Sequence, residues 1–304
     1  MSGIVVAAYS DVGYRCTKWL LDGGEKVSLI YTHPDSPAEE RWWEAVGDLA
    51  ASRAVPLRVV EDLNDPGEVP RLASLAPEFL FSFYFRRMIP KEILAIPAKG
   101  ALNMHGSFLP QFRGRSPVNW AVLKGATFTG ASLHYMVEKP DAGDLVDQEK
   151  VPIGPDDDAL TVARRVGDAA VTVLARSWPK LKAGTAPRVP LDLSQGSYFG
   201  ARKPEDGRID WTQNAKEIHD LVRAVTRPWP GAFTDLFGPN VVIWKTRLSR
   251  YGGHDTFPGK IEITENSVIV YAGDDRPVEI LLARPDGGKD LDAPGFCDWL
   301  LRRS

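Results

Sequence analysis

This sequence contains little that would support a disulfide scaffold, a thiolate metal site or a membrane segment. Only two cysteines occur in 304 residues, Cys16 and Cys297, and no Cys-x-x-Cys pair is present, so we expect neither a disulfide framework nor a bound metal. No apolar run approaches the ~18 residues needed to cross a bilayer. The short apolar start at residues 4–8 has no basic residues before it. A cytoplasmic protein without membrane insertion is therefore the expectation.

Two nucleotide-binding signatures and an excess of positive charge are also absent. No Gly-x-Gly-x-x-Gly follows the first apolar run, where Gly13 stands alone, and no Gly-x-x-x-x-Gly-Lys-Ser/Thr occurs, which disfavours a dinucleotide or P-loop site. The 37 basic and 40 acidic residues give a net charge of −3, so nothing indicates nucleic acid as a partner. The composition, 43% hydrophobic and 25% charged, is that of a globular protein with one or two domains.

Short apolar runs alternate with amphipathic segments over the first two thirds of the chain. The runs are rich in Val, Ile and Phe, as in strands buried on both faces, and the alternation predicts a Rossmann-like, mostly parallel sheet with helices on both faces. Expected strands cover residues 3–9, 27–32, 55–60, 79–85, 101–105, 133–137 and 145–153. Expected helices cover residues 12–21, 38–53 and 69–75, and a longer one begins near residue 160 and is closed by Pro179.

A change of composition predicts a second domain. Residues 183–208 are polar and rich in Gly and Pro, which indicates a linker with a boundary near residue 203. Beyond it we expect a helix at 215–225 and strands at 232–236, 241–248, 260–263, 267–271 and 278–283. A small OB-like antiparallel β barrel fits this pattern. The expected domains are a catalytic domain at 1–203 and an OB-like domain at 204–304.

Asn103 and His105 stand two residues apart at the end of an expected strand, so their side chains share one face. Histidine exchanges protons near neutrality, and a nearby carboxylate such as Asp141 raises its pKa. An Asn amide N–H can stabilise the anion that forms on an attacked carbonyl. These three chemical types together fit acyl transfer. The spacing alone, however, is more commonly that of a turn containing a hydrogen-bonded histidine.

Other polar residues have two interpretations each. Arg113 and Arg115 lie in a Gly-containing loop, where guanidinium groups can bind carboxylate or phosphate or can form a solvated charged surface. The pairs 86–87 and 202–203 are similar basic dipeptides. Ser107 lacks the Gly-x-Ser-x-Gly elbow of a serine hydrolase. The remaining histidines show no metal-ligand spacing and are expected to be structural or surface residues: His33, His134, His219 and His254.

Residues 103–117 read Asn-Met-His-Gly-Ser-Phe-Leu-Pro-Gln-Phe-Arg-Gly-Arg-Ser-Pro, and residues 140–143 read Pro-Asp-Ala-Gly. This highly specific pattern resembles the 10-formyltetrahydrofolate-dependent formyltransferase family. Within the family, the chain most resembles enzymes that formylate UDP-4-amino-4-deoxy-L-arabinose in lipid A modification, a cause of polymyxin resistance. The likeness weakens after about residue 255 and includes residues 81–86, 118–120, 129–134, 223–225 and 228–233.

The resemblance implies an N-formyltransferase that uses 10-formyltetrahydrofolate as co-substrate and no metal. It implies that His105 accepts a proton from the attacking amine, that Asp141 raises the pKa of His105, and that Asn103 stabilises the oxyanion. It also implies a formyl-folate site lined by Arg87, Met88, Ile89, Arg115, Val137, Glu138, Lys139, Pro140 and Asp141.

The acceptor amine has several candidates. A nucleotide-linked amino sugar is favoured over initiator methionyl-tRNA, because residues 204–304 carry 13 basic and 16 acidic residues and tRNA binding calls for a basic platform. A different nucleotide amino sugar is an alternative to the arabinose compound. A folate-binding module without catalysis is disfavoured, since all three catalytic positions are filled. Whether the chain forms a homo-oligomer is left open.

Overall fold

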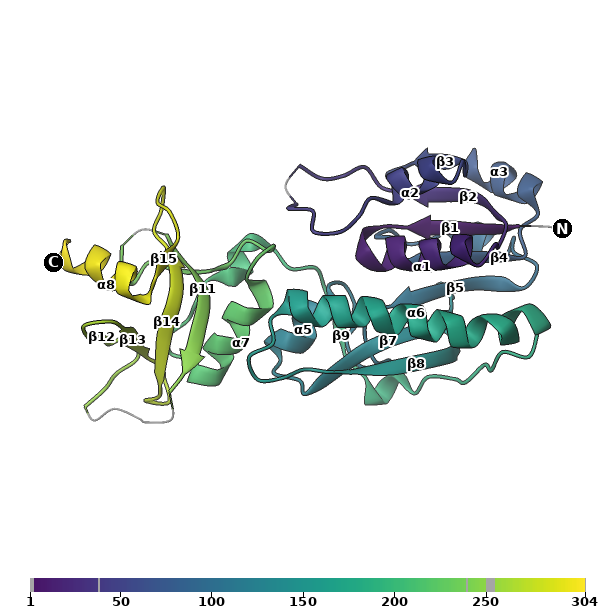
Figure 1. The fold of residues 1–304 in the computed structure, drawn as a ribbon. Helices are drawn as coiled ribbons and strands as arrows, with labels where there is room; N and C mark the ends of the chain where they lie inside the picture. The colour runs from purple at the N-terminus through teal and green to yellow at the C-terminus, as the bar shows by residue number, and fades with distance from the viewer. Residues whose placement is uncertain (1–2, 38, 239, 250–254, 304) are drawn as a thin grey trace. The chain divides into compact units, whose positions relative to one another are not determined.

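The computed structural model describes residues 3–37, 39–238, 240–249 and 255–303. Among these residues, no helix combines the length and the apolar character needed to cross a membrane. The chain divides into two compact units, each with its own sheet (Figure 1). The first unit consists of Met1–Val118, Phe128–Pro152 and Val162–Gly200, and the second of Asn119–Thr127, Ile153–Thr161 and Ala201–Ser304. The second unit thus includes two short segments, residues 119–127 and 153–161, that precede its main part in the sequence.

The sheet of the first unit has seven strands in the order β3-β2-β1-β4-β5-β7-β8. From β3 to β5 the strands pair in parallel, and β7 and β8 extend the sheet by antiparallel pairing. The strands are β1 (Ile4–Ala8), β2 (Val27–Thr32), β3 (Leu57–Val59), β4 (Phe79–Phe83), β5 (Gly100–His105), β7 (Phe128–Tyr135) and β8 (Leu145–Pro152). The predicted mostly parallel sheet is confirmed.

Helices cover both faces of this sheet. On one face, Leu72 of α3 packs in a buried cluster with Leu80 of β4. On the other face, the rings of Phe79 and Phe81 contact Trp178 of α6. Neighbouring residues of β4 therefore serve opposite faces, as the period of two requires. The helices are α1 (Ser10–Asp22), α2 (Val46–Ser52), α3 (Glu68–Leu75), α4 (Lys91–Leu94) and α6 (Ala159–Ala183).

The strand order reverses between β1 and β4, because β2 and β3 lie on one side of β1 whereas β4 and β5 lie on the other. Open α/β sheets bind ligands beyond the carboxyl ends of their strands at such a reversal. Asn103 and His105 lie in the second half of β5, at this edge. The topology thus places them where a ligand site is expected.

The helix predicted at 38–53 begins only at Val46. In the loop that precedes it, Trp43 contacts the ring of Tyr9 edge-on at 5.7 Å, and Glu39 accepts a hydrogen bond from Arg86 at 2.5 Å. These tertiary contacts are incompatible with a continuous helix and override the local periodicity. Ala38 lies outside the described residues.

Pro179 does not close α6 as predicted, since the helix continues to Ala183. A proline removes one intrahelical hydrogen bond and usually breaks or kinks a helix. Here Trp178 and Leu181, which are 5% and 2% exposed, anchor the helix on both sides of the proline. The burial of these two side chains offsets the missing bond.

The second unit contains a separate antiparallel sheet in the order β10-β11-β14-β13-β12, with β15 beside β14. Its strands are β10 (Ala232–Thr234), β11 (Val241–Leu248), β12 (Ile261–Ile263), β13 (Val268–Tyr271), β14 (Pro277–Arg284) and β15 (Leu291–Asp292). The predicted helix is α7 (Ala215–Val225). The expected C-terminal antiparallel sheet is thus confirmed, whereas α5 (Pro117–Leu123) and α8 (Ala293–Leu301) were not predicted.

The segment predicted as a polar linker contains short regular elements. They are the 3-10 helices η1 (Leu193–Gln195) and η2 (Pro204–Gly207) and the strand β9 (Tyr198–Phe199), which pairs with β6 (Arg113–Gly114). Part of the segment is therefore fixed to the loop after β5.

A buried ion pair ties both inserted segments of the second unit to α7. Arg223, 6% exposed, pairs with Asp220, 3% exposed, at 2.8 Å. The same guanidinium donates hydrogen bonds to the carbonyls of Asp157 at 2.8 Å and Val122 at 3.4 Å. Removing it would leave a buried carboxylate and two carbonyls short of a partner.

We expect Arg223→Met to lower the free energy of unfolding by about 3 kcal/mol, because Asp220 would keep only the exposed Lys216 as partner. Urea unfolding of the intact chain measures the change. Arg208→Met is the matched control, since it breaks an exposed pair with Asp235 and should leave the midpoint nearly unchanged. Equal losses in the two variants would contradict the role assigned to Arg223.

Candidate active site

Three side chains predicted from the sequence meet at the carboxyl end of β5. Asp141, in the loop between β7 and β8, places Oδ1 3.4 Å from Nδ1 of His105 and 3.4 Å from Nδ2 of Asn103. The side chains of His105 and Asp141 are only 7% and 11% exposed. An amide, an imidazole and a carboxylate are therefore assembled in a largely dry site.

His105 is held between two acceptors. Its Nδ1 faces Asp141, and its Nε2 lies 2.9 Å from the carbonyl oxygen of Phe112. Both neighbours are hydrogen-bond acceptors, so both contacts are hydrogen bonds only when the ring carries a hydrogen on each nitrogen. The Phe112 carbonyl is then placed to accept the Nε2–H of the protonated ring.

Hydrogen bonds within and around the loop after β5 hold the carbonyl of Phe112 next to the imidazole of His105. Ser107 Oγ donates to the carbonyl of Gln111 at 2.6 Å, and Ser132 Oγ of β7 donates to the carbonyl of Ser107 at 2.7 Å. Both serines are fully buried. The hydroxyl of Ser107 is thus engaged within the loop.

Asp141 occupies a backbone conformation with φ of +49°, and its Oδ2 accepts the N–H of Gly114 at 2.9 Å. Burial raises the pKa of this carboxyl, but the charge of His105 and the hydrogen bond from the Gly114 N–H together lower it well below its usual range. The group is therefore ionised at neutral pH and carries a fixed negative charge.

Gly114 allows the segment that was predicted as a linker, residues 183–208, to pack against the site. Its φ is +98°, and a Cβ at this position would lie 2.1 Å from the carbonyl oxygen of Phe199. Only glycine allows both this close approach and the contact to Asp141. The ring of Phe199 also stacks on Phe112 at 5.7 Å. Sequence reasoning missed this contribution, because a Gly- and Pro-rich polar stretch gives no strand signal.

His134 joins these residues, although its context predicted a structural or surface side chain. Its Nε2 lies 3.2 Å from Nδ2 of Asn103 and 3.6 Å from Oδ1 of Asp141, and the side chain is 2% exposed. Residue 134 is the partner of residue 103 in the β5–β7 pairing, a register that spacing along the chain does not reveal. Asn103, His105, His134 and Asp141 are called the Asp141 cluster below.

The other histidines have hydrogen-bond partners elsewhere or lie outside the described residues. His33 contacts the carbonyl of Val60 through Nδ1, and in the second unit His219 contacts Thr246. His254 is not among the described residues. Within the described part of the chain, no group of three or more His, Cys, Asp or Glu has the arrangement of a metal site.

The residues expected to bind formyl-folate lie mainly on two loops, one after β4 and one after β7. An ion pair between Lys91 and Glu138 at 3.9 Å joins the two loops. Met88 and Val137, one on each loop, are 53% and 45% exposed, whereas Ile89 is buried. The loops thus combine exposed apolar side chains with the charged residues Arg87, Glu138 and Lys139 and with Pro140 and Asp141.

The expected basic residues differ in their surroundings. Arg113 is 9% exposed and lies over the ring of Tyr198 at 6.0 Å, so it packs rather than projects into solvent. The side chain of Arg115 is exposed, and its backbone N–H donates to the carbonyl of Phe199 at 3.0 Å. Arg86 pairs with Glu39. Arg115 is therefore better placed than Arg113 to meet an anionic ligand.

A hollow of about 220 Å³ lies at the carboxyl ends of β1 and β2. It is lined by Tyr9, Ser10, His33, Arg41 and Trp43 among others. This is the same edge of the sheet that carries Asn103 and His105, and it adjoins the reversal of strand order. Aromatic side chains therefore line a depression where ligands of such sheets are usually found. Asp48 and the ion pair between Arg41 and Asp35 line it as well.

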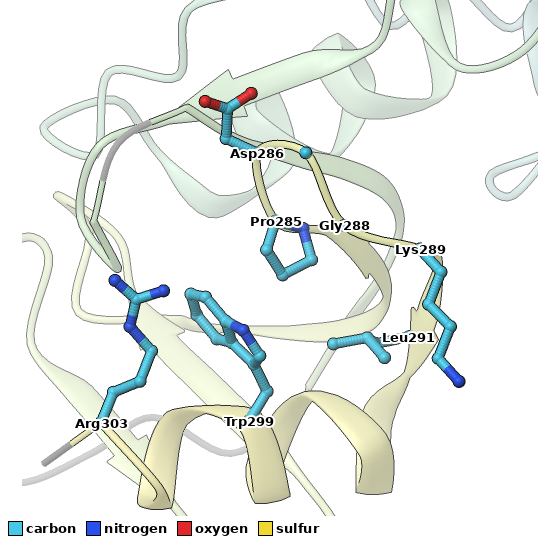
Figure 2. Close-up of a pocket in the computed structure, with 8 residues that line it drawn as sticks. Pro285, Asp286, Gly288, Lys289, Leu291, Trp299 and Arg303 are labelled. Carbon is cyan, nitrogen blue, oxygen red and sulfur yellow. The ribbon is translucent and has the colours of Figure 1, made fainter.

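A second hollow, of about 370 Å³, lies within the other unit between the β14–β15 turn and α8. Figure 2 shows that Trp299 faces Pro285 across it, whereas the charged ends of Asp286 and Lys289 point away. The guanidinium of Arg303 lies 4.5 Å from the centre of the Trp299 ring. Without converging polar groups, this hollow has no chemistry comparable to that of the Asp141 cluster.

The lowered pKa of Asp141 predicts a pH-dependent stability. Its ionised form stabilises the fold above the pKa of an unfolded aspartate, about 3.9, and this contribution is lost as the pH falls below that value. We expect Asp141→Asn to be less stable than the wild type at pH 7, with a difference that shrinks as the pH is lowered from about 5 to about 3. Urea unfolding at several pH values measures it, and a constant difference would contradict the assignment.

Solved structures share this fold. The N-formyltransferase from Helicobacter canadensis, in complex with folinic acid and dTDP-3-aminofucose, superposes with a TM-score of 0.72 at 17% identity, over 92% of this chain and 99% of that chain. WlaRD, a sugar 3N-formyl transferase in the presence of dTDP and 5-N-formyl-THF, gives 0.71 at 17% identity, over 92% and 97%. HypX from Aquifex aeolicus, in complex with tetrahydrofolic acid, gives 0.64 at 19% identity, over 99% of this chain and 47% of that chain.

Family profiles give the stronger assignment, because they cover most of the chain. The Formyl transferase profile matches residues 23–177, a region that contains the whole Asp141 cluster. The profile of the Formyl transferase C-terminal domain matches residues 202–299. The chain therefore belongs to the formyl transferase family.

Proposed function

We propose that this formyltransferase moves a formyl group from 10-formyltetrahydrofolate to the primary amine of a nucleotide-linked amino sugar. UDP-4-amino-4-deoxy-L-arabinose is the acceptor to test first. The observation that carries the proposal is the Asp141 cluster, in which Asn103, His105 and Asp141 converge at the end of β5. The donor and the acceptor follow from the loops and hollows around it.

His105 is the proposed proton acceptor. A sugar amine is largely protonated near pH 7, and it attacks a formyl carbon only as the neutral form. Nε2 of His105 is the ring nitrogen turned away from Asp141, and it takes the proton that the amine releases once the amine replaces the Phe112 carbonyl as its neighbour. The imidazolium that results is stabilised by the Asp141 carboxylate on one side and the Phe112 carbonyl on the other.

Asn103 is the proposed oxyanion donor. Attack on the formyl carbon places negative charge on its oxygen, and an amide N–H held at hydrogen-bond distance lowers the energy of that state. A single such donor contributes about 3 kcal/mol to the barrier. The ionised Asp141 supplies no proton itself, and it keeps His105 oriented.

The donor is proposed to bind between the loops after β4 and β7. Met88 and Val137 offer exposed apolar surface there, which suits one edge of a pterin ring. Arg115 and Arg87 are exposed nearby in the same unit and suit the glutamate carboxylates of a folate. The neighbours of known structure were solved with folinic acid, 5-N-formyl-THF or tetrahydrofolic acid.

A nucleotide sugar is favoured as acceptor over tRNA. Residues 204–304, which all belong to the second unit, carry more acidic than basic residues. This stretch would therefore repel a polyanion. The hollow beside β1 and β2 presents Tyr9 and Trp43, aromatic groups that can stack on a base. Arg41, which pairs there with Asp35, would hold a phosphate by exchanging that partner. The Helicobacter canadensis enzyme was solved with a dTDP-linked amino sugar.

We expect Asn103→Ala and His105→Ala each to fold normally and to lose kcat by about 10²–10³-fold, because each removes one group needed in the transition state. Rates of formyl transfer and thermal unfolding of the purified variants measure this. Asn64→Ala, which changes the same residue type at an exposed position, is the control and should keep its rate. Near-normal turnover of either site variant would defeat the assignment.

The acceptor is tested by product mass after incubation with 10-formyltetrahydrofolate. Separate reactions contain UDP-4-amino-4-deoxy-L-arabinose, a panel of other UDP- and dTDP-linked amino sugars, and methionyl-tRNA. We expect one formyl group on the arabinose compound. Formylation of another nucleotide sugar alone would change the specificity and keep the mechanism, whereas formylation of the tRNA alone would overturn the charge argument.

A further inference from the structure

His134 has an environment that fixes its hydrogen-bonding pattern. Its Nδ1 lies 2.9 Å from the carbonyl oxygen of Tyr135, which accepts hydrogen bonds only, so Nδ1 carries the hydrogen. In the neutral ring, Nε2 is then an acceptor. The atom that Nε2 meets at 3.2 Å is Nδ2 of Asn103, whose N–H completes the bond.

The amide of Asn103 has two N–H groups, and the structure treats them differently. One points to Nε2 of His134 at 3.2 Å, and the other reaches Oδ1 of Asp141 only at 3.4 Å. The contact to Asp141 lies at the long end of the hydrogen-bond range, so this N–H is not held at a close distance. The N–H near Asp141 is therefore the one available to a formyl oxygen.

We propose that His134 is a positioning residue, which holds one N–H of Asn103 so that the other is directed at the oxyanion. This inference rests on the proposed function, in which Asn103 is the oxyanion donor. His134 itself is 2% exposed and contacts Asn103 directly, so it acts through Asn103.

The opposite orientation of the amide explains why such a device is needed. If the Asn103 side chain turned over, its oxygen would face both the Nε2 lone pair of His134 and the carboxylate of Asp141. The Asn103 oxygen would then face two other hydrogen-bond acceptors, which is electrostatically unfavourable. With His134 as acceptor, the amide has one favourable orientation before substrate binds, which is the condition for efficient stabilisation of a developing charge. Because β5 and β7 pair residue 103 with residue 134, the backbone fixes this contact.

A pair of substitutions separates the two hydrogen bonds of His134. Gln at this position places an acceptor where Nε2 stands, so His134→Gln should keep kcat within about threefold of the wild type. Asn is shorter and reaches only toward the Tyr135 carbonyl, so His134→Asn should lower kcat by about 10- to 100-fold with KM for both substrates nearly unchanged. Similar kcat values in the two folded variants would overturn the proposal.

A double-mutant cycle tests whether the effect passes through Asn103. In the Asn103→Ala background, His134→Asn should cause no further loss of kcat. If wild-type protein transfers no formyl group, or Asn103→Ala keeps near-normal turnover, the proposed function fails. If Asn103→Ala is impaired but His134→Asn lowers kcat by the same factor in both backgrounds, only the positioning role fails.

A measurement on the wild type keeps the test independent of folding of the variants. Nitrogen NMR of the imidazole at neutral pH should show His134 Nδ1 protonated and Nε2 in the range of an unprotonated acceptor nitrogen. A protonated Nε2 would overturn the proposal, since it would require Asn103 to present its oxygen.

Discussion

The buried negative charge of Asp141 is the constraint on which the site depends. A carboxylate held out of water costs several kcal/mol unless it is paired and hydrogen-bonded. Here Oδ2 accepts one backbone N–H, and nitrogen atoms of Asn103, His105 and His134 lie 3.4–3.6 Å from Oδ1. The Gly114 N–H, the Asn103 amide and the His105 imidazole stabilise the charge, and the charge in turn orients them. The polar groups are thereby arranged before any substrate enters, and no reorganisation has to accompany the reaction.

Two glycines beside the site have close neighbours, a backbone carbonyl at Gly114 and a side chain at Gly106. A Cβ on Gly114 would lie 2.1 Å from the Phe199 carbonyl oxygen, and a Cβ on Gly106 would lie 1.8 Å from the hydroxyl of Tyr84. The first approach carries β6 against β9 while its N–H holds Asp141. The second leaves room for the Tyr84 side chain directly after His105. The glycines of this segment therefore do more than allow the chain to turn, because side chains there would displace the walls of the site.

The sequence predicted the parts of the site that depend on local geometry. Period two in a strand was enough to put Asn103 and His105 on one face, and family resemblance added Asp141. The sequence did not predict that His134 lies in the site. A cross-strand register depends on which strands pair, and no local pattern shows that β7 runs antiparallel beside β5. The same limit explains the helix expected at 38–53, where packing of Trp43 on Tyr9 decides the conformation.

Acceptor choice has to come from residues outside the Asp141 cluster. In the proposed function the cluster acts on a formyl carbon and an amine nitrogen, which every N-formyl transfer has in common, and the solved neighbours keep this fold at 17–19% identity. Fold therefore does not determine the acceptor. Nucleotide amino sugars differ in the base, in the sugar and in the ring position of the amine, and binding energy from the non-reacting parts of the ligand holds the amine against the formyl group. The aromatic and basic residues beside β1 and β2 lie on the cluster's edge of the sheet, so changes there should alter the choice of sugar while His105 and Asn103 keep their roles.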